Sequence, residues 1–185
     1  MILVDVLILV MFLVILIICS CIGIYSYIYN KFQDVIIRIN EVEATIDTNL
    51  RNKYDLINRV VSIVKGNIET EEEVFEDIVK LRSRKISNFE LDRKLIDANN
   101  EFQALKDKYE EINKSEEIKK ISKQLKEIDE KLTTFRDYYN DNISKYNRLV
   151  RNFPTNIVAL ACKYKEKLFF DRKDMSDEDY EDFKL

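Results

Sequence analysis

The N-terminal part of the chain carries its longest uncharged run, from Val6 to Ile28. A helix of these 23 residues would be roughly 34 Å long at about 1.5 Å per residue, enough to cross a hydrocarbon core of about 30 Å. A surface helix of a soluble domain would need a polar face, and this segment has none. The pattern therefore predicts an N-terminal transmembrane helix within residues 1–29.

Beyond residue 30, apolar residues recur every three or four positions, the period of one face of an α-helix. The first series follows the uncharged run without a break, at Val35, Ile39, Val42, Ile46, Leu50, Tyr54, Ile57, Val61 and Val64. It predicts one continuous helix from about residue 4 to residue 65, half in lipid and half in water. Gly66 is the expected C-terminal cap, because glycine adopts the left-handed conformation that ends many helices.

A second helix is predicted to begin at Thr70–Glu73, where a hydroxyl and a carboxylate have the spacing of a capping box. From Leu91 to Ile112 the apolar residues of this segment take a heptad-like spacing, as in coiled coils. The pattern predicts a second long helix that ends near Ile112.

A third helix is predicted after a tight turn at Asn113–Ser115, with Ser115 as its N-cap. Its apolar series runs from Ile118 to Tyr146 in steps of three and four. We expect the second and third helices to pack as an antiparallel hairpin.

The series stops at Asn152–Pro154, and a short fourth helix is predicted from Pro154 to Phe170. Residues 171–185 are acidic and lack periodicity, which predicts a disordered tail. The fold class is therefore all-α: a long antiparallel helical bundle over residues 30–170, with three long helices and a short fourth, on the transmembrane helix of residues 1–29.

Composition supports this fold and removes several classes of function. The chain has two glycines and one proline, too few for the turns of a sheet protein. Its net charge is −4 with basic and acidic residues interleaved, so we expect no nucleic-acid partner. The absence of histidine removes the commonest general base and the Glu-x-x-His motif of di-iron bundles. Cys19, Cys21 and Cys162 form neither a disulfide framework nor a zinc motif. We expect no catalytic residue, metal or cofactor.

The basic residues near the apolar run predict its orientation. No lysine or arginine precedes the run, whereas Lys31, Arg38, Arg51 and Lys53 follow it. The positive-inside rule then puts the N-terminus outside and the bundle in the cytoplasm of a single-pass protein of the cell membrane. A cleaved signal peptide would need a basic start and a shorter apolar run. A lipoprotein with Cys21 as the lipid-bearing residue stays open as a less favoured alternative.

Several motifs resemble those of the LemA family, in the order expected and over residues 25–170. They are Tyr29-Asn30, Ile46-Asp47, Leu50-Arg51, Lys53-Tyr54-Asp55-Leu56-Ile57, Val60-Val61, Val64-Lys65-Gly66, Glu71, Arg82, Arg136, Tyr139-Asn140, Tyr146-Asn147 and Asn152-Phe153-Pro154-Thr155-Asn156-Ile157-Val158-Ala159. The chain departs from the family pattern at Asn52, Asn58 and Glu110. The resemblance implies a membrane-anchored bundle of four helices, and the family has no established catalytic activity.

Seven polar residues near the apolar series are the candidate functional residues: Asp47, Arg51, Asp55, Arg82, Arg136, Asn140 and Asn147. We interpret them first as a network between helices that determines how the helices align. The alternative is a polar groove that binds a helix of a partner, and catalysis is the third and weakest interpretation.

Three functions from different classes follow from this sequence. The leading hypothesis is a non-enzymatic scaffold or adaptor at the cytoplasmic face, with the lipid bilayer and either copies of itself or other membrane proteins as partners. The second hypothesis is an extracytoplasmic envelope tether or sensor with the same fold. The third is an enzyme with a carboxylate-based site.

Overall fold

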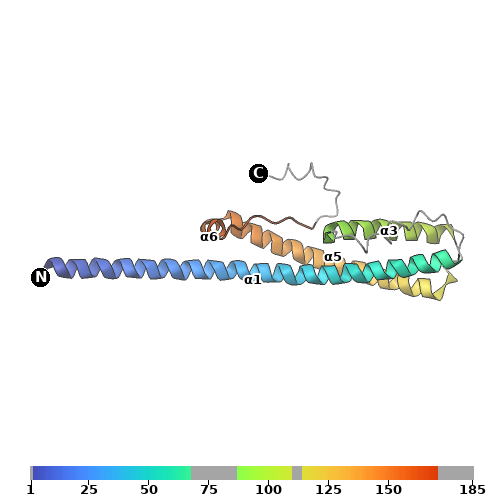
Figure 1. The fold of residues 1–185 in the computed structure, drawn as a ribbon, viewed down its shortest axis with the longest axis horizontal. Coiled ribbons are helices and arrows are strands. Elements are labelled where there is room, and N and C mark those ends of the chain that lie inside the picture. Colours follow the sequence, from blue (N-terminus) through green and yellow to red (C-terminus); the bar gives the residue numbers. More distant parts are fainter. Residues whose placement is uncertain (1, 68–86, 110–113, 171–185) are drawn as a thin grey trace. The chain divides into compact units, whose positions relative to one another are not determined.

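The protein is all-α in the residues that its computed structural model describes, which are 2–67, 87–109 and 114–170. The helices are α1 (Ile2–Asn67), α3 (Asn88–Lys108), α5 (Glu116–Arg151) and α6 (Thr155–Ala161), with no strand in these ranges (Figure 1). The predicted fold class is therefore confirmed. The capping box at residues 70–73, Arg82, Ile112, Asn113 of the predicted turn and the tail of residues 171–185 lie outside the described residues.

Helix α1 is a single helix of 66 residues that includes Asn30, so the predicted continuation of the apolar segment into the polar half is confirmed. Its end differs from the prediction, because Gly66 lies within the helix, which extends to Asn67. Glycine is tolerated inside a helix at a cost of about 1 kcal/mol relative to alanine, so its presence alone does not end a helix.

The described helices contribute to two compact units. Of the described residues, the first unit contains 2–41 and 140–168, and the second contains 42–67, 87–109 and 114–139 with Phe169 and Phe170. Helices α1 and α5 each contribute one part to the first unit and another part to the second.

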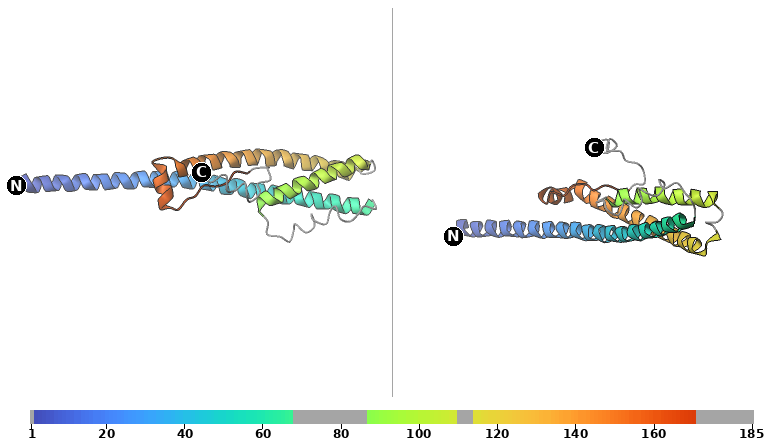
Figure 2. Two further views of the ribbon diagram at one scale, coloured as in Figure 1. Left: turned by 90° about the horizontal axis from the view of Figure 1, so that it is seen from above. Right: turned by 45° about the vertical axis from the view of Figure 1, so that its right-hand side comes forward.

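In the second unit, polar contacts establish the directions of the helices. Lys53 and Arg59 on α1 pair with Asp129 and Glu117 on α5, so a later position on α1 faces an earlier one on α5. In the same way, Asp92 and Lys106 on α3 contact Arg136 and Ser122. Helix α5 is thus antiparallel to both α1 and α3, which confirms the predicted hairpin of the second and third helices (Figures 1 and 2).

The core of the second unit comes from the predicted apolar series. Its fully buried side chains from the three helices include Ile46, Leu50, Ile57, Leu95, Phe102, Ile118, Ile121, Leu125 and Leu132. Each long buried side chain contributes about 1.5–3 kcal/mol relative to exposure. The Ser115 cap is confirmed, because the Ile118 amide donates to Ser115 Oγ at 3.4 Å. Ser87 caps α3 in the same way through the Glu90 amide, at 3.2 Å. The prediction of one second helix from residue 70 to near Ile112 was therefore wrong, because Ser87 starts a helix at Asn88 and the extended backbone of Tyr109 ends it at Lys108.

In the first unit, aromatic rings and an amide side chain join α1, α5 and the segment after α6. The ring of Phe32 lies 5.9 Å from Tyr146 and 5.1 Å from Tyr164. Asn147 donates to the Lys167 carbonyl at 2.8 Å and accepts from the Lys167 amide at 2.9 Å. These contacts hold the segment that follows α6 against the two long helices.

The fourth helix is shorter than predicted. Helix α6 begins at Thr155, with Pro154 as its N-cap after a cis peptide bond, and it ends at Ala161. Lys163 has a positive φ of 56° and donates to the Leu160 carbonyl, while the Tyr164 amide donates to Ala159. This is a Schellman motif, which ends a helix by satisfying its last carbonyls. The prediction that the helix reaches Phe170 was wrong because a lysine, which carries no signal for the left-handed conformation, occupies this position.

Candidate functional site

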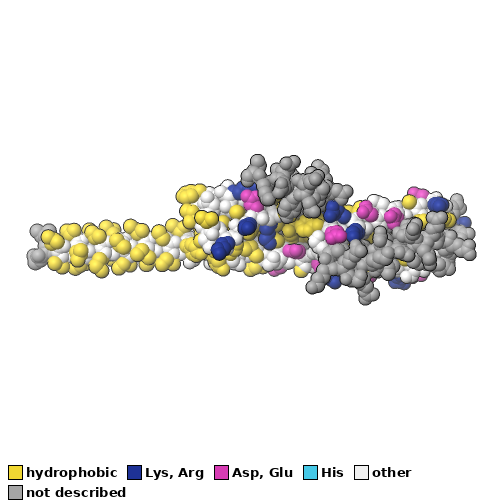
Figure 3. Space-filling view, turned by 45° about the horizontal axis from the view of Figure 1, so that its top comes forward, with side chains coloured by type: hydrophobic (Ala, Val, Ile, Leu, Met, Phe, Trp, Pro, Cys, Tyr) yellow, Lys and Arg dark blue, Asp and Glu magenta, His cyan; other side chains and the backbone are white. Residues whose placement is uncertain are grey.

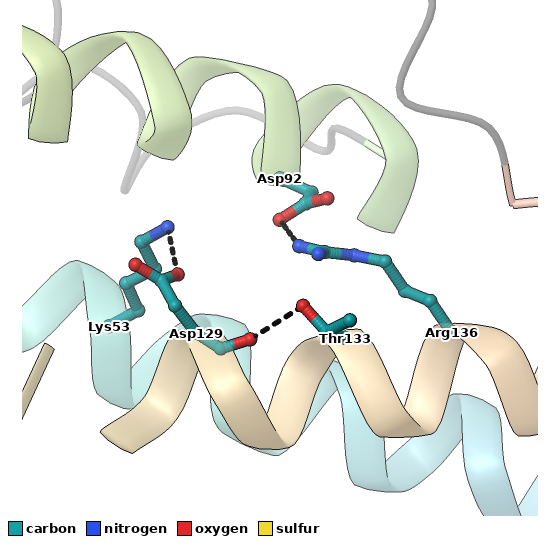
Figure 4. A network of polar contacts seen from close by, with 5 residues as sticks. All are labelled: Lys53, Asp92, Asp129, Thr133 and Arg136. Atoms are coloured by element: carbon teal, nitrogen blue, oxygen red, sulfur yellow. Dashed lines mark hydrogen bonds and ion pairs between the residues drawn. The ribbon is translucent and has the colours of Figure 1, made fainter. Parts of the chain in front are cut away.

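A polar cluster in the second unit draws on all three of its helices. Asp129, Thr133 and Arg136 lie on one face of α5, because their spacing of four and three residues is close to whole turns. Lys53 on α1 and Asp92 on α3 complete the cluster (Figure 4). We call these five residues the polar cluster.

Arg136 and Asp92 form a buried ion pair in which both side chains are almost completely inaccessible. The guanidinium of Arg136 also lies 5.7 Å from the centre of the Phe170 ring, so its face contacts an aromatic side chain. A charge at this depth is tolerated only if it is paired, because desolvation of a lone charge costs several kcal/mol. The pair therefore requires α3 and α5 to align so that these two side chains meet.

Phe170 belongs to a small group of aromatic side chains next to this ion pair. Its ring stacks on Phe89 at 4.4 Å and meets Tyr139 edge to face at 5.9 Å. Burial, with a smaller effect from the negative charge of Glu43, raises the pKa of Tyr139 to about 12. The Tyr139 hydroxyl is therefore neutral at physiological pH and is not a candidate base.

The second ion pair joins Lys53 Nζ to Asp129 Oδ1 at 2.7 Å. Lys53 is 1% exposed, whereas Asp129 is 38% exposed, so the ammonium is buried and its partner faces a cavity. Thr133 Oγ1 donates to the Asp129 carbonyl at 2.9 Å, which satisfies the hydroxyl within α5 (Figure 4).

A cavity of about 890 Å³ opens beside the polar cluster. It is lined by Lys53, Ile96, Asn99, Asn100, Gln103, Lys106, Ser122, Lys123, Leu125, Lys126, Asp129, Glu130, Thr133 and Arg136. The lining contains five basic and two acidic side chains, so its field attracts anionic groups. Arg136 Nε is buried and has no hydrogen-bond acceptor among the described residues. We call this lined space the polar groove.

The basic lining does not suit a cation. Among the described residues, no three His, Cys, Asp or Glu side chains lie close enough together to hold a metal ion. The expectation that the protein uses no metal or cofactor and has no catalytic residue stays a prediction.

The structure separates the three candidate residues on α1 from the groove. Arg51 Nε donates to Asp47 at 2.8 Å within the same helix, which raises the pKa of Arg51, and its side chain is 73% exposed. Asp55 is also exposed. Asp47 is half-buried and its ion pair is with Arg51 of the same helix, so the interpretation of these three residues as part of a network between helices stays a prediction.

The other candidate residues lie in different places. Of the seven, only Arg136 belongs to the polar cluster, and Arg82 lies outside the described residues. Asn147 is buried in the first unit, where it binds the backbone of Lys167, and Asn140 is half-buried in that unit. Asn147 therefore has a structural role in holding the chain after α6.

Four residues of the polar cluster were not among the candidate residues predicted from the sequence: the uncharged Thr133 and the charged Lys53, Asp92 and Asp129. Each of the three charged residues lies three or four residues from a buried apolar residue of its own helix: Leu50, Leu95 and Leu125. A charged residue at a position where the period predicts a buried one is the signal that could have found them.

The comparisons with known proteins agree with the fold. Of the described helices, α1 alone is long and apolar enough to cross a membrane, and none of its apolar window is buried. A search of the curated proteins finds no match. The model of the LemA family matches residues 42–181, which is more than half of the chain. The chain is therefore a membrane-anchored helical protein that belongs to the LemA family.

Proposed function

We propose that the protein is a non-enzymatic scaffold or adaptor that presents its polar groove to partner proteins at the cytoplasmic face of the membrane. The observation that carries the proposal is the continuity of α1. This one helix includes both the apolar segment and Lys53, which lines the groove. A groove built on a membrane-anchored helix meets the partners that share the same membrane surface.

The chemistry of the groove favours binding over catalysis. Its two buried basic side chains are each already paired with a carboxylate, so neither is poised as an acid or base. The exposed lysines at its rim, Lys123 and Lys126, give it an excess of positive charge. The proposed occupant is an acidic helical segment of another membrane protein or of a second copy of this chain.

Site-specific crosslinking in native membranes tests this proposal. A photoreactive amino acid replaces Lys126 in the groove, and the matched control replaces Lys131, an exposed lysine on the same helix that does not line the groove. We expect discrete crosslinked products from position 126 that are absent from position 131. The same products from both positions, or none from position 126, would contradict a partner-binding groove.

The cytoplasmic location rests on the basic residues that follow the apolar segment, and protease treatment of intact cells tests it. A tag at the C-terminus should survive protease added outside and be digested after the membrane is opened. Digestion from outside would instead favour the second function, an extracytoplasmic tether or sensor with the same groove.

An enzyme with a carboxylate-based metal site is the remaining alternative. Metal analysis of the purified full-length protein tests it directly. We expect no stoichiometric metal, and one bound metal per chain would overturn the non-enzymatic proposal.

A further inference from the structure

Helix α6 of the first unit exposes an apolar face. Phe153, two residues before α6, and Ile157 and Leu160 within it are 80%, 58% and 82% exposed. The spacing of three residues puts Ile157 and Leu160 on the same side of the helix. Val158 and Ala159 on the opposite side are buried. Three large exposed apolar side chains within residues 153–160 are a strong concentration for a surface that faces water.

This face lies beside the part of α1 in which the apolar segment ends. The hydroxyl of Tyr25 lies 3.5 Å from Cys162 Sγ, directly after α6, and Tyr25 is one turn from Ile28, the end of that segment. Gln33, beyond the segment, donates to the Tyr164 hydroxyl at 2.8 Å. In Figure 3, apolar side chains cover α1 as far as the place where α6 lies beside it, and basic side chains appear from there on.

The part of the first unit that lies outside the apolar segment is basic. Outside the apolar segment, its residues 29–41 and 140–168 carry eight lysines and arginines against four aspartates and glutamates, a net charge of +4. The whole chain has a net charge of −4. Lys163 and Lys165, which follow α6, are exposed. Basic residues of this kind are attracted to anionic headgroups within a Debye length of the membrane surface.

The face is held in place by the rest of the first unit. Arg151 on α5 binds Glu166 through hydrogen bonds of 2.6 and 2.5 Å, and Asn147 binds the backbone of Lys167. These contacts join the segment after α6 to α5. They therefore restrict the movement of α6 and of its exposed apolar side chains.

We propose that α6 is a second membrane contact of this protein. Phe153, Ile157 and Leu160 insert into the interfacial layer of the leaflet from which α1 emerges, and Lys163 and Lys165 bind anionic headgroups beside them. An apolar face with flanking lysines is the composition of helices that lie in the membrane interface. The contact concerns the leaflet at the bundle end of the span, so it holds for either orientation of the protein.

A single tryptophan tests the insertion, because the chain contains none. Leu160→Trp is introduced into the full-length protein in vesicles that contain lipids with brominated acyl chains. We expect blue-shifted emission that bromine quenches strongly and aqueous iodide quenches weakly. Tyr138→Trp, at an exposed position on α5 in the second unit, is the control and should show the opposite pattern. Leu160→Trp that behaves like this control would overturn the proposal.

The same probe separates lipid from protein as the occupant. Vesicles with about one chain each should quench Leu160→Trp as strongly as crowded vesicles do. If the protection of this tryptophan from iodide disappears when the number of chains per vesicle is lowered, the occupant is a second copy of the chain. If the protection is found only in native membranes, the occupant is another protein. Either result would overturn the lipid contact.

The lysines are tested with the same tryptophan. Bromine quenching of Leu160→Trp should be stronger in vesicles with anionic phosphatidylglycerol than in zwitterionic ones. Lys163→Asn with Lys165→Gln should remove this difference, with asparagine chosen because it tolerates the positive φ of position 163. A difference that survives both substitutions would contradict the role of the lysines.

Discussion

The two units bury different kinds of polar group. Among the described residues, the buried charged side chains Lys53, Asp92 and Arg136 all belong to the second unit. The buried polar side chains of the first unit are amides, Asn142 and Asn147. Among their buried polar groups, the unit that contains the apolar segment therefore uses neutral amides, while the other unit uses charged side chains in ion pairs.

The difference has a physical reason. A buried ion pair repays its desolvation only with good geometry, and this cost rises in surroundings of low dielectric constant. Neutral amides and aromatic rings carry a smaller cost of this kind. Ion pairs add specificity in return, because they stabilise one alignment of the helices and penalise the others. The second unit, which contains the polar groove, is where such specificity serves the proposed function.

The largest expected effect comes from Arg136→Ala, which leaves Asp92 charged, buried and unpaired. We expect the free energy of unfolding to fall by about 3–5 kcal/mol. Urea unfolding of the full-length protein in detergent, followed by circular dichroism, measures it. The double variant Arg136→Met with Asp92→Leu should lose less than Arg136→Ala, since it removes both charges. An unchanged unfolding curve for Arg136→Ala would refute the role of this pair in aligning the helices.

A smaller loss is expected for Asp129→Ala, which leaves the buried ammonium of Lys53 without its partner. Because Asp129 is partly exposed and water can reach the site, we expect a loss of about 2 kcal/mol. The same unfolding measurement applies. Lys53→Met, which keeps the length of the side chain and removes the charge, should be better tolerated; a larger loss for Lys53→Met would show that the pair itself stabilises the unit.

In the first unit, Asn147→Ala removes two hydrogen bonds to the backbone of Lys167. We expect a loss of about 1–3 kcal/mol and faster hydrogen exchange over residues 164–168. Hydrogen exchange with mass spectrometry should show little change around the ion pairs of the second unit. Equal loss of protection in both units would refute the independence of their polar contacts.

A pH dependence should come from Tyr139 in the second unit. Its pKa is about 12 in the folded protein, against an ordinary value of 10.0. Because the folded state holds this proton more tightly than the unfolded state, its contribution to stability is complete below pH 10 and is lost between about pH 10 and pH 12. Unfolding measured across this range should show a fall that Tyr139→Phe reduces. An equal fall in Tyr139→Phe would assign it to other groups.

The smallest effect is expected for Arg51→Ala, which breaks the exposed pair with Asp47. A solvent-exposed pair at i, i+4 contributes little to stability and is screened by salt, so we expect a barely measurable loss. The same urea unfolding, repeated at low and high salt, measures it. A loss comparable to that of Arg136→Ala would instead favour Arg51 as part of the network between helices.

What the sequence by itself determined is local to each helix. The uncharged run, the apolar series, the cap at Ser115 and the break before Pro154 each depend on residues within a few turns, so periodicity and capping chemistry predict them. The same local rules identified the all-α fold and the continuous α1, and the motifs of the chain identified its family.

What only the tertiary structure decided depends on residues distant in sequence. Lys53 meets Asp129 across 76 positions, and Asp92 meets Arg136 across 44. Neither pairing is predictable from the period of one helix, because it depends on how far one helix is shifted along another. The exposed face of α6 likewise depends on packing, because packing determines which of its apolar side chains are buried. The helices are thus properties of the sequence, while the groove and the second membrane contact arise from their assembly.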